Sequence, residues 1–120
     1  MQIAFAETAE FTASLTEYFP TDDHYRLLQL FLSNNPEAGP VIRGTGGLRK
    51  ARWPDIRRGM GKRGGLRVIY IYVPQASYIG FVTVYGKDES DDLTAEQRSL
   101  LRVAAARLRA DLMERREGPR

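Results

Sequence analysis

The sequence predicts an α+β fold in which a small, mostly antiparallel sheet is backed by an N-terminal pair of helices and a C-terminal helix. Three observations lead to this prediction. Two β-rich runs occupy positions 66–73 and 78–87, and the residues between them suit a hairpin turn. Apolar residues recur at helical spacing in two segments before position 36. A third amphipathic segment begins near position 97.

The N-terminal part reads as one strand followed by two helices. Residues 3–5 form a short apolar run typical of a strand, and the helix that follows ends at Pro20. Thr21 precedes two acidic residues, which predicts the N-cap of a second helix that ends before Pro36. We expect the two helices to form a hairpin. Their apolar positions are Phe11, Leu15, Tyr18 and Phe19 in the first, and Tyr25, Leu28, Phe31 and Leu32 in the second.

The middle of the chain predicts a strand and then a loop. Residues 48–53 alternate in a way that places Leu48, Lys50 and Arg52 on one side of a strand. Residues 54–65 are dense in Gly and Arg and are expected to form a loop that leads into the β-hairpin.

The C-terminal part predicts a turn and a long helix. An acidic turn at 88–92 precedes Thr94 and Gln97, whose spacing is that of a capping box. The helix continues to Leu112, and the tail from Met113 is expected to fray. The predicted order of elements is therefore β, α, α, β, β, β, α.

Length and composition limit the class of protein. With 120 residues and 42% hydrophobic residues, the chain has room for one core, so we expect a single domain over 1–120. There is no cysteine, which excludes disulfides and thiolate metal sites. Neither a signal peptide nor an apolar stretch long enough to span a bilayer is evident. We expect a cytoplasmic protein that does not bind membranes.

Positive charge is concentrated in one segment. Residues 43–67 hold nine basic residues and one acid, Asp55, a local charge of +8, whereas the whole chain carries +3. The rest of the chain is therefore net acidic. Such a field attracts polyanions, and release of counterions from phosphate makes a nucleic acid the favoured partner. A solvated basic loop is the simpler alternative.

Several chemical motifs can be excluded. The run at 59–64, GMGKRG, matches a dinucleotide-binding fingerprint in letters, but a strand follows it where a helix is required. It also lacks the Ser or Thr of a phosphate-binding P-loop. The single histidine, His24, cannot form a histidine pair, and no cofactor or metal is expected. The acids at 88–92 suit a polar turn before a helix better than a Mg²⁺ site.

The few lysines are a more specific signal. The chain has 18 basic residues, of which only Lys50, Lys62 and Lys87 are lysines, and all lie in or beside the basic loop and the central strands. Nearby cations and desolvation can shift the pKa of a lysine enough for it to act as an acid or base, which arginine ordinarily cannot do. A bias toward arginine in the genome is the alternative explanation.

Three blocks resemble the HigB-like branch of the RelE/ParE superfamily of toxins. They are GTGGLRKAR at 44–52, GKRGGLRVIYIY at 61–72 and FVTVYGKDESDDLT at 81–94. The resemblance implies a RelE-like α+β fold related to microbial ribonucleases. It also implies the toxin of a type II toxin–antitoxin system, an mRNA interferase that cleaves translated mRNA in the ribosomal A site. The implied partners are the ribosome and a HigA-like helix-turn-helix antitoxin.

The resemblance also assigns site residues. Lys50, Arg52, Arg67 and Lys87 match the basic positions of RelE-like enzymes and form the expected catalytic set, in an endoribonuclease that needs no metal. Asp88 stands where RelE itself has a catalytic arginine. Lys87 is thus the expected acid, with Lys50 as base or electrostatic activator. The expected RNA-binding residues are Arg49, Arg57, Arg58, Lys62, Arg63, Tyr70 and Tyr85. Thr94 replaces the family's stacking aromatic, a role that a tyrosine of the hairpin could take.

Two other functions remain open at this stage. ParE-type relatives share the fold but inhibit DNA gyrase, although the retained basic strand residues argue against that function. A non-catalytic nucleic-acid-binding module would use the same basic patch to contact phosphate without cutting.

Overall fold

The computed structural model describes residues 2–59, 65–86 and 93–117, and it has the predicted α+β architecture. The order of helices and strands agrees with the sequence prediction. Two short 3₁₀ helices lie in the connections that follow β2 and β3. The elements are β1 (Ala4–Glu7), α1 (Ala9–Tyr18), α2 (Asp22–Asn34), β2 (Arg49–Trp53), η1 (Ile56–Arg58), β3 (Leu66–Val73), η2 (Pro74–Ala76), β4 (Tyr78–Gly86) and α3 (Ala95–Glu117).

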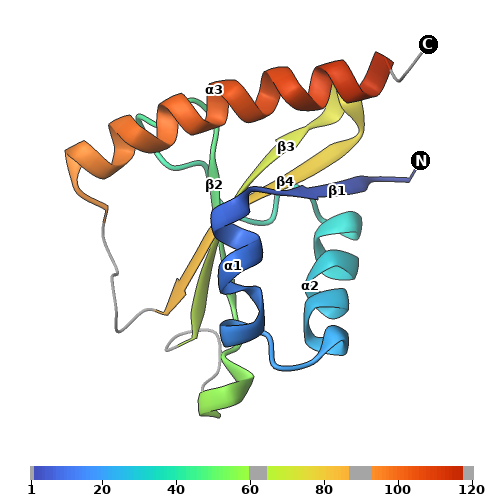
Figure 1. Cartoon of the computed structure of the whole chain (residues 1–120), viewed down its shortest axis with the longest axis vertical. Helices are drawn as coiled ribbons and strands as arrows, with labels where there is room; N and C mark the ends of the chain where they lie inside the picture. The colour runs from blue at the N-terminus through green and yellow to red at the C-terminus, as the bar shows by residue number, and fades with distance from the viewer. Residues whose placement is uncertain (1, 60–64, 87–92, 118–120) are drawn as a thin grey trace.

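The strands form one four-stranded sheet in the order β1-β4-β3-β2. The pairs β2–β3 and β3–β4 are antiparallel, whereas β1 runs parallel to β4. The sheet is thus antiparallel-dominated, as predicted. β2 is an edge strand, and Figure 1 shows α3 crossing one end of the strands while α1 and α2 lie side by side below it.

The predicted N-cap of α2 is confirmed, because Thr21 accepts a hydrogen bond from the backbone N–H of His24, the third residue of the helix. Thr8, for which no cap was predicted, caps α1 in the same way by accepting from Phe11. The predicted capping box is confirmed: the backbone N–H of Thr94 donates to Oε1 of Gln97 (2.8 Å), and the N–H of Gln97 donates to Oγ1 of Thr94 (3.1 Å).

Two apolar clusters cover the two faces of the sheet. α1 and α2 bury Phe11, Leu28 and Leu32 on one face, against strand residues that include Tyr70 and Phe81. On the other face, α3 presents a row of buried residues to the upper part of the strands; this cluster contains Leu48, Ile69, Ile71, Val82, Ala105, Leu108 and Leu112. Most of the free energy that holds the three layers together therefore comes from apolar burial.

A glycine of β4 sets how closely α3 approaches the sheet. A Cβ atom at Gly80 would lie 2.7 Å from Cδ2 of Leu108 and 3.2 Å from Cδ1 of Leu112. The absence of a side chain at Gly80 therefore lets two leucines of α3 pack directly on the strand.

The end of α3 differs from the prediction. The tail from Met113 was expected to fray, yet the helix continues to Glu117. Leu112 is fully buried and Met113 packs against the same apolar cluster, so tertiary contacts stabilise the end of the helix. No helix among the described residues is both long and apolar enough to span a bilayer.

Candidate nucleic-acid interface

Lys50 and Arg52 lie on the same face of the sheet as α3, which packs on another part of that face. Lys50 lies opposite Ile69 of β3, and Ile69 belongs to the α3-side cluster together with Leu48. Directly opposed residues of antiparallel strands point to the same face. The prediction that Leu48, Lys50 and Arg52 share one side of the strand is therefore confirmed.

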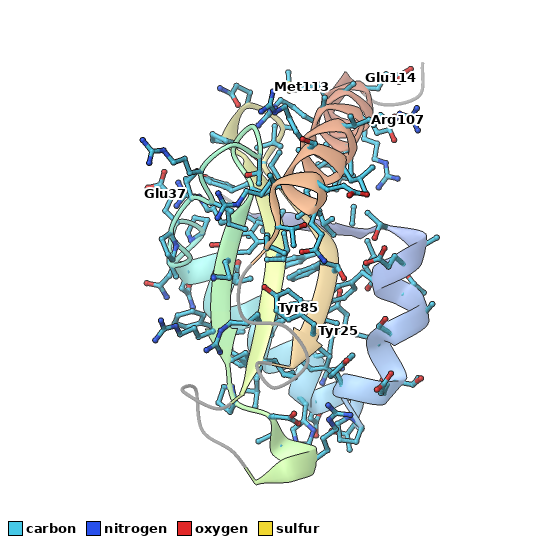
Figure 2. The ribbon with its side chains drawn as sticks, turned by 90° about the vertical axis from the view of Figure 1, so that its left-hand side faces the viewer. Tyr25, Glu37, Tyr85, Arg107, Met113 and Glu114 are labelled. Carbon is cyan, nitrogen blue, oxygen red and sulfur yellow. The ribbon has the colours of Figure 1, made fainter. Side chains whose placement is uncertain are left out.

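Arg52, Arg67 and Tyr85 form a row across three strands. Arg67 of β3 is paired with Arg52 on one side and with Tyr85 of β4 on the other. Figure 2 shows Tyr85 on the part of the sheet below α3. The structure thus brings three of the predicted site residues together on one face, with Lys50 in the adjacent row.

A β-bulge in β4 turns Tyr85 toward this row. The pairing of β3 with β4 shifts between Ile69 and Tyr70, so that Ile69 faces Thr83 while Tyr70 faces Phe81. Val82 is the extra residue, and the alternation of side chains changes phase there. Without the bulge, Val84 would face α3 and Tyr85 would point to the opposite face of the sheet.

The two cations of β2 on this face are available to an anion. Arg52 is exposed and Lys50 is half-buried. Within residues 2–59, 65–86 and 93–117, neither side chain makes a hydrogen bond or an ion pair. Two adjacent positive charges without a carboxylate partner are the electrostatic requirement for a phosphate contact.

Arg67 lies deeper than the sequence suggested. Its side chain is buried, with 2% of the residue exposed, and its Nη1 donates to the backbone carbonyl of Leu66 at 3.3 Å. In this conformation it cannot contact a phosphate directly. Its charge nevertheless lies beside Arg52 in a region of low dielectric, where it adds to the positive potential of the row.

Two of the predicted RNA-binding arginines are held by internal contacts. Arg49 donates to the carbonyl of Gly39 (2.8 Å) and pairs with the Glu37 carboxylate (3.6 Å). Arg57 donates through Nε to Asp55 (3.1 Å), pairs with Glu17 (3.5 Å), and stacks over a tyrosine ring. Asp55 is 1% exposed, so this pair anchors the connection after β2. Arg49 and Arg57 therefore stabilise the fold through internal contacts, which leaves their charges less available to RNA.

Tyr70 requires a correction. It was expected to bind RNA, but the residue is fully buried in the cluster beneath α1 and α2. Its hydroxyl donates to the carbonyl of Pro36 (2.9 Å) and accepts from the N–H of Gly39 (3.0 Å). Burial raises the pKa of this phenol. Tyr70 therefore fixes the loop after α2 and offers no ring to a base.

Four predicted residues cannot be placed. Lys62, Arg63 and Lys87 lie outside the described residues, as does the acidic turn at 88–92, and for Arg58 only the backbone is described. The roles assigned to them remain predictions.

A cavity opens beside the same cations, and the sequence did not indicate it. It has a volume of about 350 Å³ and lies along the edge of β2. Phe31, which the sequence identified only as part of an apolar stripe, forms one wall. Helical spacing predicts that such a residue packs inward, and no local signal distinguishes a core ring from one beside a cavity. The lining residues are Phe31, Ala38, Pro40, Lys50, Ala51 and Arg52.

Several solved structures resemble this chain. No family model matches the sequence. The fold is similar to that of the E. coli toxin RelE, in a structure of the free state that carries two arginine-to-alanine substitutions. The two chains are 15% identical, the match covers 76% of this chain and 90% of that one, and the TM-score is 0.49.

Proposed function

We propose that this protein is the toxin of a type II toxin–antitoxin system and a ribosome-dependent endoribonuclease of the HigB-like branch. One observation carries the proposal: Lys50 and Arg52 lie side by side on one face of the sheet without a carboxylate partner among the described residues. The three sequence blocks that resemble HigB-like toxins include both positions. Together, these features favour cleavage of RNA at this face.

The chemistry requires three polar groups and no metal. The 2′-hydroxyl of RNA attacks the adjacent phosphorus and forms a 2′,3′-cyclic phosphate, while the bond between phosphorus and the 5′-oxygen breaks. One group accepts the 2′-hydroxyl proton, a second stabilises the negative charge that builds on the phosphate oxygens, and a third protonates the departing 5′-oxygen. The electron pair of the broken bond leaves with the 5′-oxygen.

The side chains are assigned to these roles by position. Lys50 serves as the base or as an electrostatic activator of the 2′-hydroxyl, and Arg52 clamps the scissile phosphate. Arg67, because it is buried, acts as a positioning residue that raises the local potential and supports Arg52. Lys87, which follows β4, supplies the proton to the leaving group. Tyr85 shares the row with Arg52 and Arg67, and in this proposal its ring contacts the substrate.

The proposed site is suited to a substrate that the ribosome holds in place. Without a strong base, the rate depends mainly on how the substrate is positioned, and the ribosome can impose that geometry on flexible mRNA. Arg58, Lys62 and Arg63 contact ribosomal RNA in this proposal. The active toxin would be a cytoplasmic protein, silenced by a helix-turn-helix antitoxin of the HigA kind.

Primer extension after induction of the protein tests the proposal. We expect new 5′ ends within translated mRNA, in phase with codons, and none in untranslated transcripts. Induced DNA damage with intact transcripts would indicate a gyrase inhibitor, and salt-sensitive RNA binding without new ends would indicate a non-catalytic module. Either result would refute the endoribonuclease.

Two substitutions of Lys50 separate its possible roles. Lys50→Ala should lower the cleavage rate about 100- to 1000-fold, the effect of losing one well-aimed catalytic group. Lys50→Arg keeps the charge but not the ability to exchange a proton, so it restores cleavage only if Lys50 acts electrostatically. Arg26→Ala is the matched control, because Arg26 is an exposed cation of α2, a helix on the sheet face opposite Lys50.

A further inference from the structure

The cavity at the edge of β2 has two unlike walls. Phe31 of α2 and Ala38 and Pro40 of the following loop supply an apolar wall. On the other side, Lys50 to Arg52 line it in succession. Neighbouring residues of a strand point to opposite faces, so a cavity bordered by three in a row lies at the strand's edge rather than on one face.

The cations that border the cavity carry their charge to the face where the proposed phosphate contact lies. Lys50 and Arg52 belong to both the cavity lining and the row beside Arg67. A ligand seated between Phe31 and the strand therefore lies beside the stretch of β2 that carries these two cations, and it reaches their charged groups around the strand edge. Glu37 lies near the cavity, but its carboxylate is paired with Arg49 at 3.6 Å, which offsets its charge.

Size, walls and charge together match one part of a nucleotide. A volume of about 350 Å³ is at the lower end of small-ligand pockets and has room for a planar ring system. Nucleobases bind to aromatic and apolar surfaces that flank the cations that hold the backbone. Phe31 offers such a surface, and its ring packs against Trp53 in a tilted arrangement with a centroid distance of 5.5 Å.

We infer that this cavity is a nucleobase subsite, which receives the base of the RNA nucleotide whose phosphate lies against Lys50 and Arg52. The inference rests on the proposed function for the identity of the ligand as RNA. It adds that Phe31, Ala38 and Pro40 determine which nucleotides are tolerated beside the cut. Preference among bases thus arises at the edge of the sheet, and bond cleavage on its face.

An extended peptide added to β2 fits the cavity less well. The loop before β2 already occupies part of the edge, since the N–H of Lys50 donates to the carbonyl of Pro40 (3.0 Å) and the N–H of Ile42 donates to the carbonyl of Leu48 (2.7 Å). β2 spans only Arg49–Trp53, so little of the edge is left for a new ladder. Strand addition depends on several consecutive backbone hydrogen bonds.

The single tryptophan provides a direct assay on the full-length protein. Trp53 contacts Phe31 and is the only tryptophan in the chain. We would titrate the 3′-monophosphates of the four ribonucleosides and follow Trp53 fluorescence, excited at wavelengths where nucleotides do not absorb. We expect a saturable change with nucleotides and none with inorganic phosphate alone. At least one base should bind more tightly than the others.

Two variants locate the binding site. Phe31→Leu keeps an apolar contact with Trp53 but removes the aromatic surface, and we expect nucleotide affinity to fall about 5- to 100-fold. Ala38→Glu changes an exposed residue, so folding is undisturbed, and it places a carboxylate at the mouth of the cavity. It should weaken binding as well. Leu30→Glu, an exposed position of α2 that does not line the cavity, makes the same charge change and should have no effect.

The outcomes separate the subsite from the proposed function. Binding that is equal in wild type, Phe31→Leu and Ala38→Glu would overturn the inference, as would the absence of a fluorescence change at millimolar nucleotide. If mRNA is cleaved but Phe31→Leu leaves both the rate and the bases beside the cut unchanged, the subsite is wrong and the endoribonuclease stands. If nucleotides bind at Phe31 without cleavage, the subsite stands and the endoribonuclease is wrong.

Discussion

Arg49 and Arg52 lie on the same short strand, yet their surroundings differ. Arg49 points toward the α2 side, where it holds the carbonyl of Gly39 at 2.8 Å and pairs with Glu37. Arg52 points to the opposite face, beside Lys50, and has no acidic partner among the described residues. The strand therefore separates a structural cation from a pair that is available to a ligand. Figure 2 shows Glu37 on the β2 side of the molecule, away from Tyr85.

The comparison shows that the net charge of a sequence segment overestimates how many of its cations are available to bind a polyanion. Residues 43–67 carry a net charge of +8 in the sequence. Part of that charge is used internally, because Arg49 and Arg57 both pair with carboxylates. Cations that are already paired contribute less to attracting a polyanion than those that face solvent alone. Which arginines remain available is decided by the fold.

The largest expected effect is on the cleavage rate, and it should distinguish Arg52 from Arg49 on the same strand. Arg52→Ala should lower the rate of mRNA cleavage about 100- to 1000-fold, since it removes the proposed phosphate clamp. It should change the free energy of unfolding by no more than about 0.5 kcal/mol, because Arg52 is an exposed side chain. Cleavage of a translated reporter mRNA and urea unfolding measure the two effects.

Arg49→Ala should give the reverse pattern. It removes a hydrogen bond to Gly39 and should destabilise the protein by about 1 to 2 kcal/mol, while cleavage per folded molecule changes little. A loss of cleavage with Arg49→Ala as severe as with Arg52→Ala would mean that the two faces of β2 do not have separate roles.

The pair between Arg57 and the buried Asp55 after β2 should have the next largest effect. Asp55 accepts from Arg57 at 3.1 Å and is 1% exposed, so Asp55→Ala leaves the guanidinium without its main acceptor. We expect a loss of about 1.5 to 3 kcal/mol in the free energy of unfolding, measured by urea. Glu17→Ala removes the more exposed partner of the same arginine and should cost less than about 1 kcal/mol. Equal losses would contradict the assignment of Asp55 as the anchor.

Alkaline pH should weaken the fold through buried tyrosines. Burial raises the pKa of Tyr70, and burial together with a hydrogen bond to Glu7 raises the pKa of Tyr25. Above about pH 10 the unfolded chain loses these phenol protons while the folded protein keeps them, so stability falls as pH rises. Tyr70→Phe should make the decline between about pH 10 and pH 11 shallower, by up to about 1.4 kcal/mol per pH unit. An unchanged slope in that variant would show that Tyr70 does not contribute.

The smallest expected effect concerns the exposed partner of Arg49. The Glu37 side chain is 71% exposed, so Glu37→Gln should cost no more than about 0.5 kcal/mol and should lose that effect at high salt. Thermal unfolding at low and high ionic strength measures it. A loss above about 1 kcal/mol would mean that the pair with Arg49 is stronger than an exposed ion pair, and that Glu37 helps to keep Arg49 away from the other face.

Local patterns predicted the elements well where they depend on near neighbours. The caps at Thr21 and Thr94, the hairpin around Pro74 and the alternation of Leu48, Lys50 and Arg52 all depend on residues a few positions apart. The predicted end of α3 was wrong because Met113 packs against the cluster between α3 and the sheet, a contact with residues far along the chain.

The candidate site was predictable only in part. The face shared by Lys50 and Arg52 follows from the period of a strand. The role of Tyr70 was wrong because its partners, Pro36 and Gly39, lie far along the chain and only the folded structure brings their backbone groups to its hydroxyl. The cavity beside Phe31 likewise joins residues from α2, a loop and β2.

The sequence by itself determined the α+β order of elements and the side of β2 that carries Lys50 and Arg52, because both follow from the repeat of the backbone and the propensities of nearby residues. Tertiary structure alone decided which cations are paired, how deeply Arg67 is buried, and that a bulge at Val82 turns Tyr85 toward Arg67. These features depend on contacts between distant segments and on small shifts in strand register. Neither can be recognised from the hydrophobic pattern of the sequence.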